Sequence, residues 1–431
     1  MTKIYARIAI FWDKSFLWSL IAYDTFRELG LDFDLLTAGD IRGQRLAGYD
    51  VLFVPGGWAS DKMEALGVEG AGAIRSFVAE GGSYLGFCGG AGLALTHSSG
   101  LGLVEIGRLP TSVRVPSFSG PIHLRQEDPG HPIWNGVPDD TEFHAWWPGQ
   151  FSLKDAGTGV RVLARYGEPG DGSFVTDVPV LPDMDWRVWE ERYGINLNPG
   201  RIVGEPAVIE AGYGSGRALL SYPHFETPGD AAGAKVLLNI IEYLAGGEKV
   251  RGRKEDAESI EESGGGSAAV ASFAGDRKAK AGMLAGELRK SAEELISFGE
   301  DNHLWFQRNP WILQWRRGVR GVEYSTLYAM IARLDRVIAA ADAIDQLTVE
   351  NLDRLREISG PFFREAPKLL ELESAAMAHG PVNPLKTDDR QISELRERLF
   401  SNSKRCGGLY EEIINLADAT LLPLLKNPPS R

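Results

Sequence analysis

A single cysteine lies at the centre of the pentapeptide Gly86-Phe87-Cys88-Gly89-Gly90, directly after an apolar run. This spacing is typical of a nucleophile elbow, a sharp strand-to-helix turn that strains its central residue and requires small neighbours two positions away on each side. The start of the following helix would favour the thiolate form of Cys88. The pattern alone also fits a small cysteine buried among glycines, so both interpretations stay open.

A nucleophilic thiol needs a base, and the base needs a group that orients it. The segment "SYPHFETPGD" supplies His224 and Glu226 at the end of the strand-like stretch "RALLSYPH". Residues two apart in an extended segment point to the same side, so the carboxylate can hold the imidazole while the imidazole faces the thiol. An ordinary solvated loop is the alternative for such a His-x-Glu pair.

The loop "VPGGW", residues 54–58, follows another strand-like segment. The backbone N–H groups of Gly57 and Gly89 could form an oxyanion hole for a tetrahedral intermediate. The alternative is a turn that only ends a strand.

Four further residues follow predicted strands or occupy nearby loops. Asp13 and Ser15 could contact a ligand or cap a helix, whereas Trp58 and Trp147 could wall a substrate pocket or pack a lid. The histidines between residues 123 and 144 match no metal-binding spacing, and we expect neither a metal nor another cofactor.

Strand-like and helix-like patterns alternate in the first part of the chain. Strands are predicted at 7–12, 32–38, 49–57 and 83–88, and amphipathic helices at 16–30 and 70–82. Such alternation predicts a flavodoxin-like, doubly wound, mostly parallel sheet within an α/β domain. Ligands of such sheets bind at the carboxyl ends of the strands, where Cys88 and His224 both lie.

Residues 100–200 contain short strand-like stretches, prolines and many tryptophans, and we expect excursions over one end of the sheet. The α/β pattern returns at 206–246, where "GYGSG" superficially resembles a phosphate loop. Because that sequence joins two strand patterns, a hairpin turn is the better interpretation.

The domain boundaries follow from changes in composition. We predict an α/β domain over 1–247, a charged and glycine-rich flexible linker over 248–275, and a C-terminal all-α helical bundle over 276–431. The tryptophan- and arginine-rich strip 303–321 fits either the bundle core or a surface that binds RNA or a partner.

The charge, the cysteine count and the distribution of apolar residues make several classes of function improbable. A formal net charge of −13 in 431 residues argues against a general nucleic-acid or membrane binder. Cys88 and Cys406 are the only cysteines, too few for a disulfide framework, and Cys406 is expected to be a structural or incidental thiol. We find neither a signal-peptide core nor an apolar run long enough to span a membrane, and we therefore expect a cytoplasmic protein.

These motifs together resemble the class I glutamine amidotransferase-like superfamily, and within it the biotin-protein ligase N-terminal domain type. The resemblance covers residues from about 4 to 246 and rests on "DVLFVPGG", "YLGFCGGAGLAL", "WWPGQF" and "ALLSYPHFE". It does not extend to the helical C-terminal region.

The resemblance implies a thiol hydrolase that cleaves an amide-type C–N bond through an acyl-enzyme. Cys88 would be the nucleophile, His224 the base, Glu226 its orienting partner, and Gly57 with Gly89 the oxyanion donors.

Gly92 stands where glutamine amidotransferases commonly have a glutamine that holds the substrate. A small-molecule or peptide amide other than free glutamine is therefore the expected substrate. The alternative function is a non-catalytic binding or scaffold protein whose helical domain binds a protein partner or a second copy.

Overall fold

The computed structural model describes residues 6–97, 100–154, 159–246, 268–380, 382–383, 385–401 and 405–427. The chain divides into two compact units, Met1–Lys254 and Glu255–Arg431.

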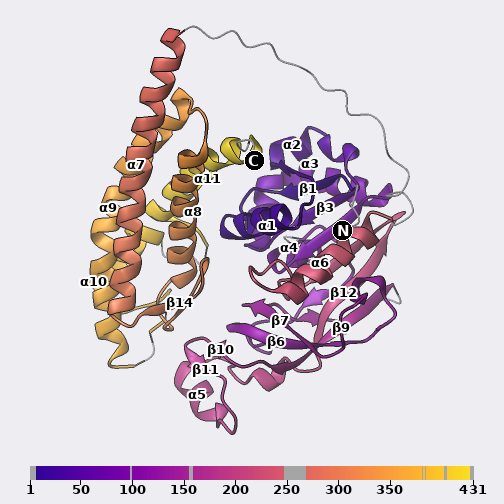
Figure 1. Cartoon of the computed structure of the whole chain (residues 1–431). Coiled ribbons are helices and arrows are strands. Elements are labelled where there is room, and N and C mark those ends of the chain that lie inside the picture. Colours follow the sequence, from indigo (N-terminus) through magenta and orange to yellow (C-terminus); the bar gives the residue numbers. More distant parts are fainter. Residues whose placement is uncertain are drawn as a thin grey trace. The chain divides into compact units, whose positions relative to one another are not determined.

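The first unit is built on one mixed sheet of eleven strands (Figure 1). Its order from edge to edge is β11-β10-β6-β9-β12-β13-β4-β3-β1-β2, and β7 pairs with β6. The strands are β1 Ile8–Phe11, β2 Phe33–Leu36, β3 Val51–Val54, β4 Ser83–Phe87, β6 Phe118–Gln126, β7 Thr141–Trp146, β9 Val160–Pro169, β10 Phe174–Val175, β11 Val178–Pro179, β12 Pro206–Tyr213 and β13 Gly216–Ser221. The short strands β5 Gly107–Arg108 and β8 Phe151–Ser152 form a separate pair.

One half of this sheet is parallel, and it contains the predicted strands. Neighbours β2, β1, β3, β4 and β13 all run in the same direction. Every residue of β1, β3 and β4 is buried, as expected for strands that helices cover on both faces. The helices of this unit are α1 Leu17–Glu28, α2 Ala38–Arg42, α3 Ala59–Ala79, α4 Gly89–Ala94, α5 Trp186–Tyr193 and α6 Ala231–Leu244.

The other half is antiparallel, so the expectation of a mostly parallel sheet is wrong. Strands β12, β9, β6, β10, β11 and β7 pair with antiparallel neighbours and extend the same sheet (Figure 1). Residues 100–200 therefore add strands to the sheet, whereas the sequence predicted only excursions over one end of it. In this half, β6 alternates buried and partly exposed residues along its second part, as a strand does when one face is less covered. The turn at "GYGSG" does join β12 to β13 as a hairpin.

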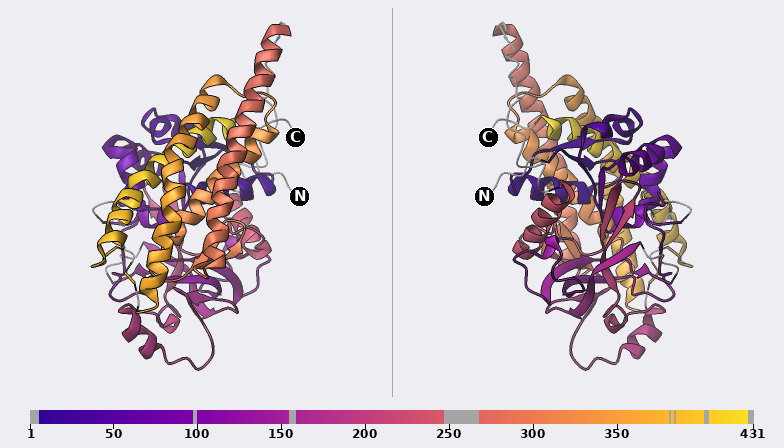
Figure 2. Two further views of the ribbon diagram at one scale, coloured as in Figure 1. Left: turned by 90° about the vertical axis from the view of Figure 1, so that its left-hand side faces the viewer. Right: turned by 90° about the vertical axis from the view of Figure 1, so that its right-hand side faces the viewer.

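The second unit contains long helices that pack side by side (Figure 2). Its described helices are α7 Ala268–Asp301, α8 Gly321–Ala340, α9 Gln346–Met377, α10 Arg390–Phe400 and α11 Gly408–Lys426. The all-α expectation misses a β-hairpin, β14 Trp305–Asn309 and β15 Ile312–Trp315, which occupies the tryptophan-rich strip. Its β-branched and aromatic residues around the Asn-Pro turn favour strands over a helix.

The predicted linker extends too far toward the C-terminus. Helix α7 begins at Ala268, inside the range 248–275, because the alanine-rich segment continues the helical pattern that follows it. Residues 248–267 of the predicted linker lie outside the described residues.

Candidate active site

Cys88 occupies the turn between β4 and α4 with a strained backbone. Its φ of 48° and ψ of −105° lie in a region that side chains rarely adopt. Its N–H donates to the Ser221 carbonyl at 2.8 Å, because β4 and β13 are parallel neighbours in the sheet. The half-buried thiol lies 3.9 Å from the Trp146 carbonyl oxygen. The cysteine is therefore held at the carboxyl edge of the sheet, next to the end of β13.

Close backbone contacts explain the glycines around this cysteine. A Cβ at Gly89 would overlap the Gly57 carbonyl oxygen, and a Cβ at Gly90 would overlap the Val54 carbonyl oxygen. At Gly86 a Cβ would lie 2.7 Å from the Gly90 carbonyl group. Only glycine fits these three positions, and the loop after β3 is consequently pressed against the residue that follows the cysteine.

His224 and Glu226 form a buried pair just beyond β13. Nδ1 of His224 lies 2.8 Å from Oε1 of Glu226, and the two residues are 1% and 0% exposed. The imidazole stacks on the Trp18 indole at a centroid distance of 4.5 Å. The other ring nitrogen, Nε2, is buried and makes no hydrogen bond to the described residues. The carboxylate and the indole thus fix the ring and leave Nε2 for a further partner.

The charge of the imidazole depends on this pairing. Burial lowers the pKa of His224, but the Glu226 carboxylate and the Cys88 thiol together outweigh burial and raise the pKa to about 10. The ring is therefore an imidazolium at neutral pH, and Cys88 is one of the groups that stabilise its charge.

Other main-chain bonds hold the segment that carries the pair. The hydroxyl of Thr227 donates to the His224 carbonyl at 2.8 Å, and the hydroxyl of Thr25 donates to the Glu226 carbonyl at 2.9 Å. The N–H of His224 donates to the His144 carbonyl at 2.8 Å. Both sides of the segment are thus tied to neighbouring elements, which limits movement of the imidazole.

The remaining residues singled out from the sequence take different positions. Asp13 accepts a hydrogen bond from the Ala38 N–H at 2.8 Å, at the start of α2. Ser15 is buried and accepts a hydrogen bond from the Lys62 ammonium. Trp58, 50% exposed, directly follows the Gly57 loop, and Trp147 lies edge-on to Trp18 at 6.3 Å. The two tryptophans thus lie near the site, whereas Asp13 and Ser15 make hydrogen bonds to other residues of the protein.

Similar solved structures include a proposed GMP synthase component from Thermoplasma acidophilum and PurLQS from Thermotoga maritima. The first has a TM-score of 0.38 at 14% identity over 58% of this chain and 99% of that chain. The second has a TM-score of 0.37 at 18% identity over 57% of this chain and 100% of that chain. A beta-galactosidase from Bacillus circulans sp. alkalophilus aligns over 57% of this chain and 32% of its own, with a TM-score of 0.34 at 17% identity. No family model and no curated protein matches the chain.

Sequence reasoning missed Lys62, which is fully buried in α3. Its ammonium donates to the Ser15 hydroxyl and to the Lys14 carbonyl, the latter at 3.3 Å, so it joins the loop after β1 to the helix after the Gly57 loop. The sequence contains a signal for this burial, because Lys62 stands four residues before the buried Leu66 and therefore lies on the same helix face.

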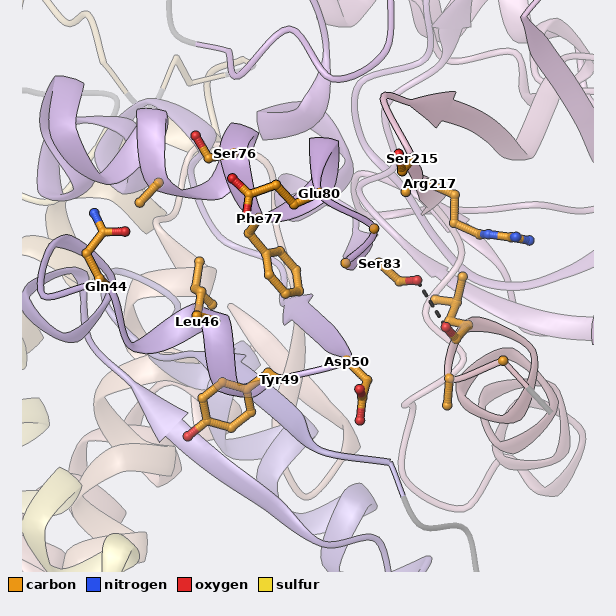
Figure 3. A pocket seen from close by; sticks show the side chains of 18 of the residues that line it. Gln44, Leu46, Tyr49, Asp50, Ser76, Phe77, Glu80, Ser83, Ser215 and Arg217 are labelled. Atoms are coloured by element: carbon orange, nitrogen blue, oxygen red, sulfur yellow. Dashed lines mark hydrogen bonds between the residues drawn. The ribbon is translucent and has the colours of Figure 1, made fainter. Parts of the chain in front are cut away.

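A cavity of about 840 Å³ lies at the opposite edge of the sheet. Its lining includes Asp50, Ser83 and Arg217, which stand at the amino ends of β3, β4 and β13 (Figure 3). The Ser83 hydroxyl there donates to the Leu244 carbonyl at 3.0 Å. None of the candidate catalytic residues lines this cavity.

Among the described residues, no group of three or more His, Cys, Asp and Glu side chains could hold a metal ion. No described helix is long and apolar enough to cross a membrane.

Proposed function

We propose that the first unit is a cysteine-dependent hydrolase of amide-type bonds. The observation that supports it best is the buried His224–Glu226 pair, which lies beyond β13 next to the strained Cys88 at the end of β4. A cysteine, an imidazole and an orienting carboxylate are the parts that acyl transfer by a thiol requires.

In the proposed reaction, His224 begins as the imidazolium, with Nε2 holding the proton that the Cys88 thiol has given up, and the Cys88 thiolate attacks the amide carbonyl. The N–H groups of Gly57 and Gly89 stabilise the resulting oxyanion. As the C–N bond breaks, the imidazolium returns its proton to the leaving amine. Water then attacks the thioester with His224 as the base, which releases the carboxylic acid and restores the thiolate and the imidazolium.

The raised pKa of His224 suits this order of steps. An amine is a poor leaving group until it is protonated, and an imidazolium with a pKa of about 10 holds the required proton at neutral pH. Glu226 stabilises that charge and keeps the ring in one orientation.

The motifs quoted above support membership of the class I glutamine amidotransferase-like superfamily, of the biotin-protein ligase N-terminal domain type. Gly92 offers no side chain to hold glutamine, so we assign a different amide of a small molecule or peptide. The helical unit is proposed to bind a protein partner or a second copy, and the cytoplasm is the proposed location.

Alkylation of the native protein tests the nucleophile. At pH 7, where free thiols are mostly protonated, iodoacetamide should label Cys88 at least tenfold faster than Cys406, as read by peptide mass spectrometry. His224→Ala should remove most of that advantage, whereas Cys406→Ser should leave it unchanged. Equal and slow labelling of both cysteines would contradict the nucleophilic role and favour a binding or scaffold function.

Ammonia release tests the reaction. A panel of amides that includes glutamine should contain a substrate from which the protein releases ammonia, and Cys88→Ala should abolish the release. Release that persists in Cys88→Ala would refute the acyl-enzyme mechanism.

A further inference from the structure

Arg114 is a buried arginine without an acidic partner in the described part of the chain. It is 9% exposed, and its Nη1 donates to the Pro148 carbonyl at 3.1 Å. Its Nε is buried and makes no hydrogen bond to the described residues. Burying a guanidinium costs several kcal/mol unless an anion or acceptors compensate it. This arginine therefore has unused capacity for an anion.

Two buried tyrosines also carry a polar atom that makes no hydrogen bond to the described residues. Tyr166 of β9 and Tyr222, which follows β13, are 0% and 1% exposed. Neither hydroxyl has a hydrogen-bond partner among the described residues. The Tyr222 ring packs on Phe151 at a centroid distance of 4.2 Å, and a Cβ at Gly149 would lie 2.6 Å from its hydroxyl oxygen. Natural proteins rarely leave such groups unsatisfied, so each one calls for an explanation.

Main-chain contacts connect these groups to the thiol. Residues 146–148 contact both, because the Trp146 carbonyl is 3.9 Å from Sγ of Cys88 and the Pro148 carbonyl accepts a hydrogen bond from Arg114. On the other side, the N–H of Cys88 bonds to the carbonyl of Ser221, the residue immediately before Tyr222.

The electrostatics agree with this placement. Burial lowers the pKa of Arg114, exposed Arg108 lowers it further, and Tyr222, Cys88 and Tyr166 are the groups that oppose the change. The candidate nucleophile and the two tyrosines are thus near enough to Arg114 to influence its pKa.

We infer that Arg114, Tyr166 and Tyr222 form a subsite beside Cys88 that binds a carboxylate of the substrate, an assignment that rests on the proposed function. A guanidinium and two hydroxyls supply donors to a planar anion of one negative charge, which matches a carboxylate. A doubly charged phosphate would leave its second charge uncompensated at a buried site. The substrate class is therefore an amide that also carries a carboxylate.

Binding can be measured without turnover in the Cys88→Ala protein. The probes are the monoamides of malonate, succinate and glutarate, each compared by calorimetry with the uncharged diamide of the same length. At least one monoamide should bind tenfold or more tightly than its diamide. Arg114→Met should abolish that preference, and Arg114→Lys should retain only part of it because the planar fork is lost. Arg125→Met, which removes an exposed arginine of the same unit, should leave the preference unchanged.

Hydroxyl deletions separate ligand binding from folding. Tyr166→Phe and Tyr222→Phe should each weaken monoamide binding severalfold and leave diamide binding unchanged. Because these hydroxyls have no partner in the described protein, both variants should also unfold at a higher temperature. A purely structural role would instead lower the unfolding temperature and affect both probes alike.

The outcomes distinguish this subsite from the proposed reaction. Equal binding of monoamides and diamides, or a preference that survives Arg114→Met in a folded protein, would overturn the subsite even if Cys88 proves reactive. A monoamide preference that depends on Arg114 would support the subsite even if Cys88 proves unreactive and the hydrolase proposal fails.

Discussion

The imidazole of His224 links the chemistry of the site to its stability. The ring is fully enclosed, stacked on Trp18 and paired with Glu226, so its protonation is part of the folded arrangement. A buried imidazolium without the carboxylate would be expelled or neutralised. One carboxylate therefore supports both the orientation of the base and its charge.

This pairing predicts a pH dependence of unfolding. The folded-state pKa of His224 is raised from 6.5 to about 10, so its contribution to stability is complete below pH 6.5 and is lost as the pH rises through about 10. The unfolding temperature of the first unit should therefore fall between pH 6.5 and 10. In Glu226→Gln this fall should be smaller, as measured by near-ultraviolet circular dichroism. An identical pH profile in both proteins would show that Glu226 does not set the charge of His224.

At the scale of elements, the elbow depends on three chain segments that approach at backbone distance. The turn after β4 presses on the loop after β3, and its own N–H is bonded to the end of β13. Side chains cannot be accommodated where these backbones meet.

Gly89→Ala should therefore destabilise the first unit by about 3 kcal/mol or more and slow alkylation of Cys88, because the added methyl would overlap the Gly57 carbonyl. Gly92→Ala is the matched control in the same helix, since its Cβ would meet no atom closer than the Ala59 Cβ at 3.8 Å. The control should be neutral or stabilising by up to about 1 kcal/mol. Urea unfolding and alkylation rates report both effects, and equal losses in the two variants would contradict the close-approach explanation.

The same elements show how far sequence reasoning reaches. The local hydrophobic periodicity and the glycines at the ends of elements predict the parallel strands and the turn at Cys88, because these features depend on residues that are neighbours in the sequence. The antiparallel strands depend on pairing partners far apart in sequence, as when β6 pairs with β9 and β9 with β12. Arg114 lies before β6, Tyr166 in β9 and Tyr222 directly after β13, and these residues share no motif, so their proximity to Cys88 could not be predicted from the sequence.

At the scale of the whole molecule, the core of the helical unit contains a buried ion pair between two of its helices. Nε of Arg396 donates to Oε1 of Glu373 at 2.7 Å, and both residues are 1% exposed. The guanidinium also donates to the Asn383 and Gly318 carbonyls, at 2.8 and 3.4 Å. One side chain thus joins α9, α10 and two connecting segments.

Arg396→Met should cost about 3–5 kcal/mol in urea unfolding, because it leaves a buried carboxylate without its cation. Glu373→Leu combined with Arg396→Met should recover most of that loss. The exposed pair Arg390–Glu394 provides the control, and Arg390→Ala should cost less than about 1 kcal/mol. A double variant no more stable than Arg396→Met alone would contradict this account of the pair.

The order of strands also determines when the site can exist during synthesis. Strand β4 carries Cys88, yet its neighbour β13 and the segment with His224 follow only after residues 89–215. A nascent chain on the ribosome therefore carries its cysteine for most of the first unit's translation before the imidazole emerges. Until then the edge of β4 has no β13 to pair with, and the newly made protein must keep this unfinished edge from aggregating.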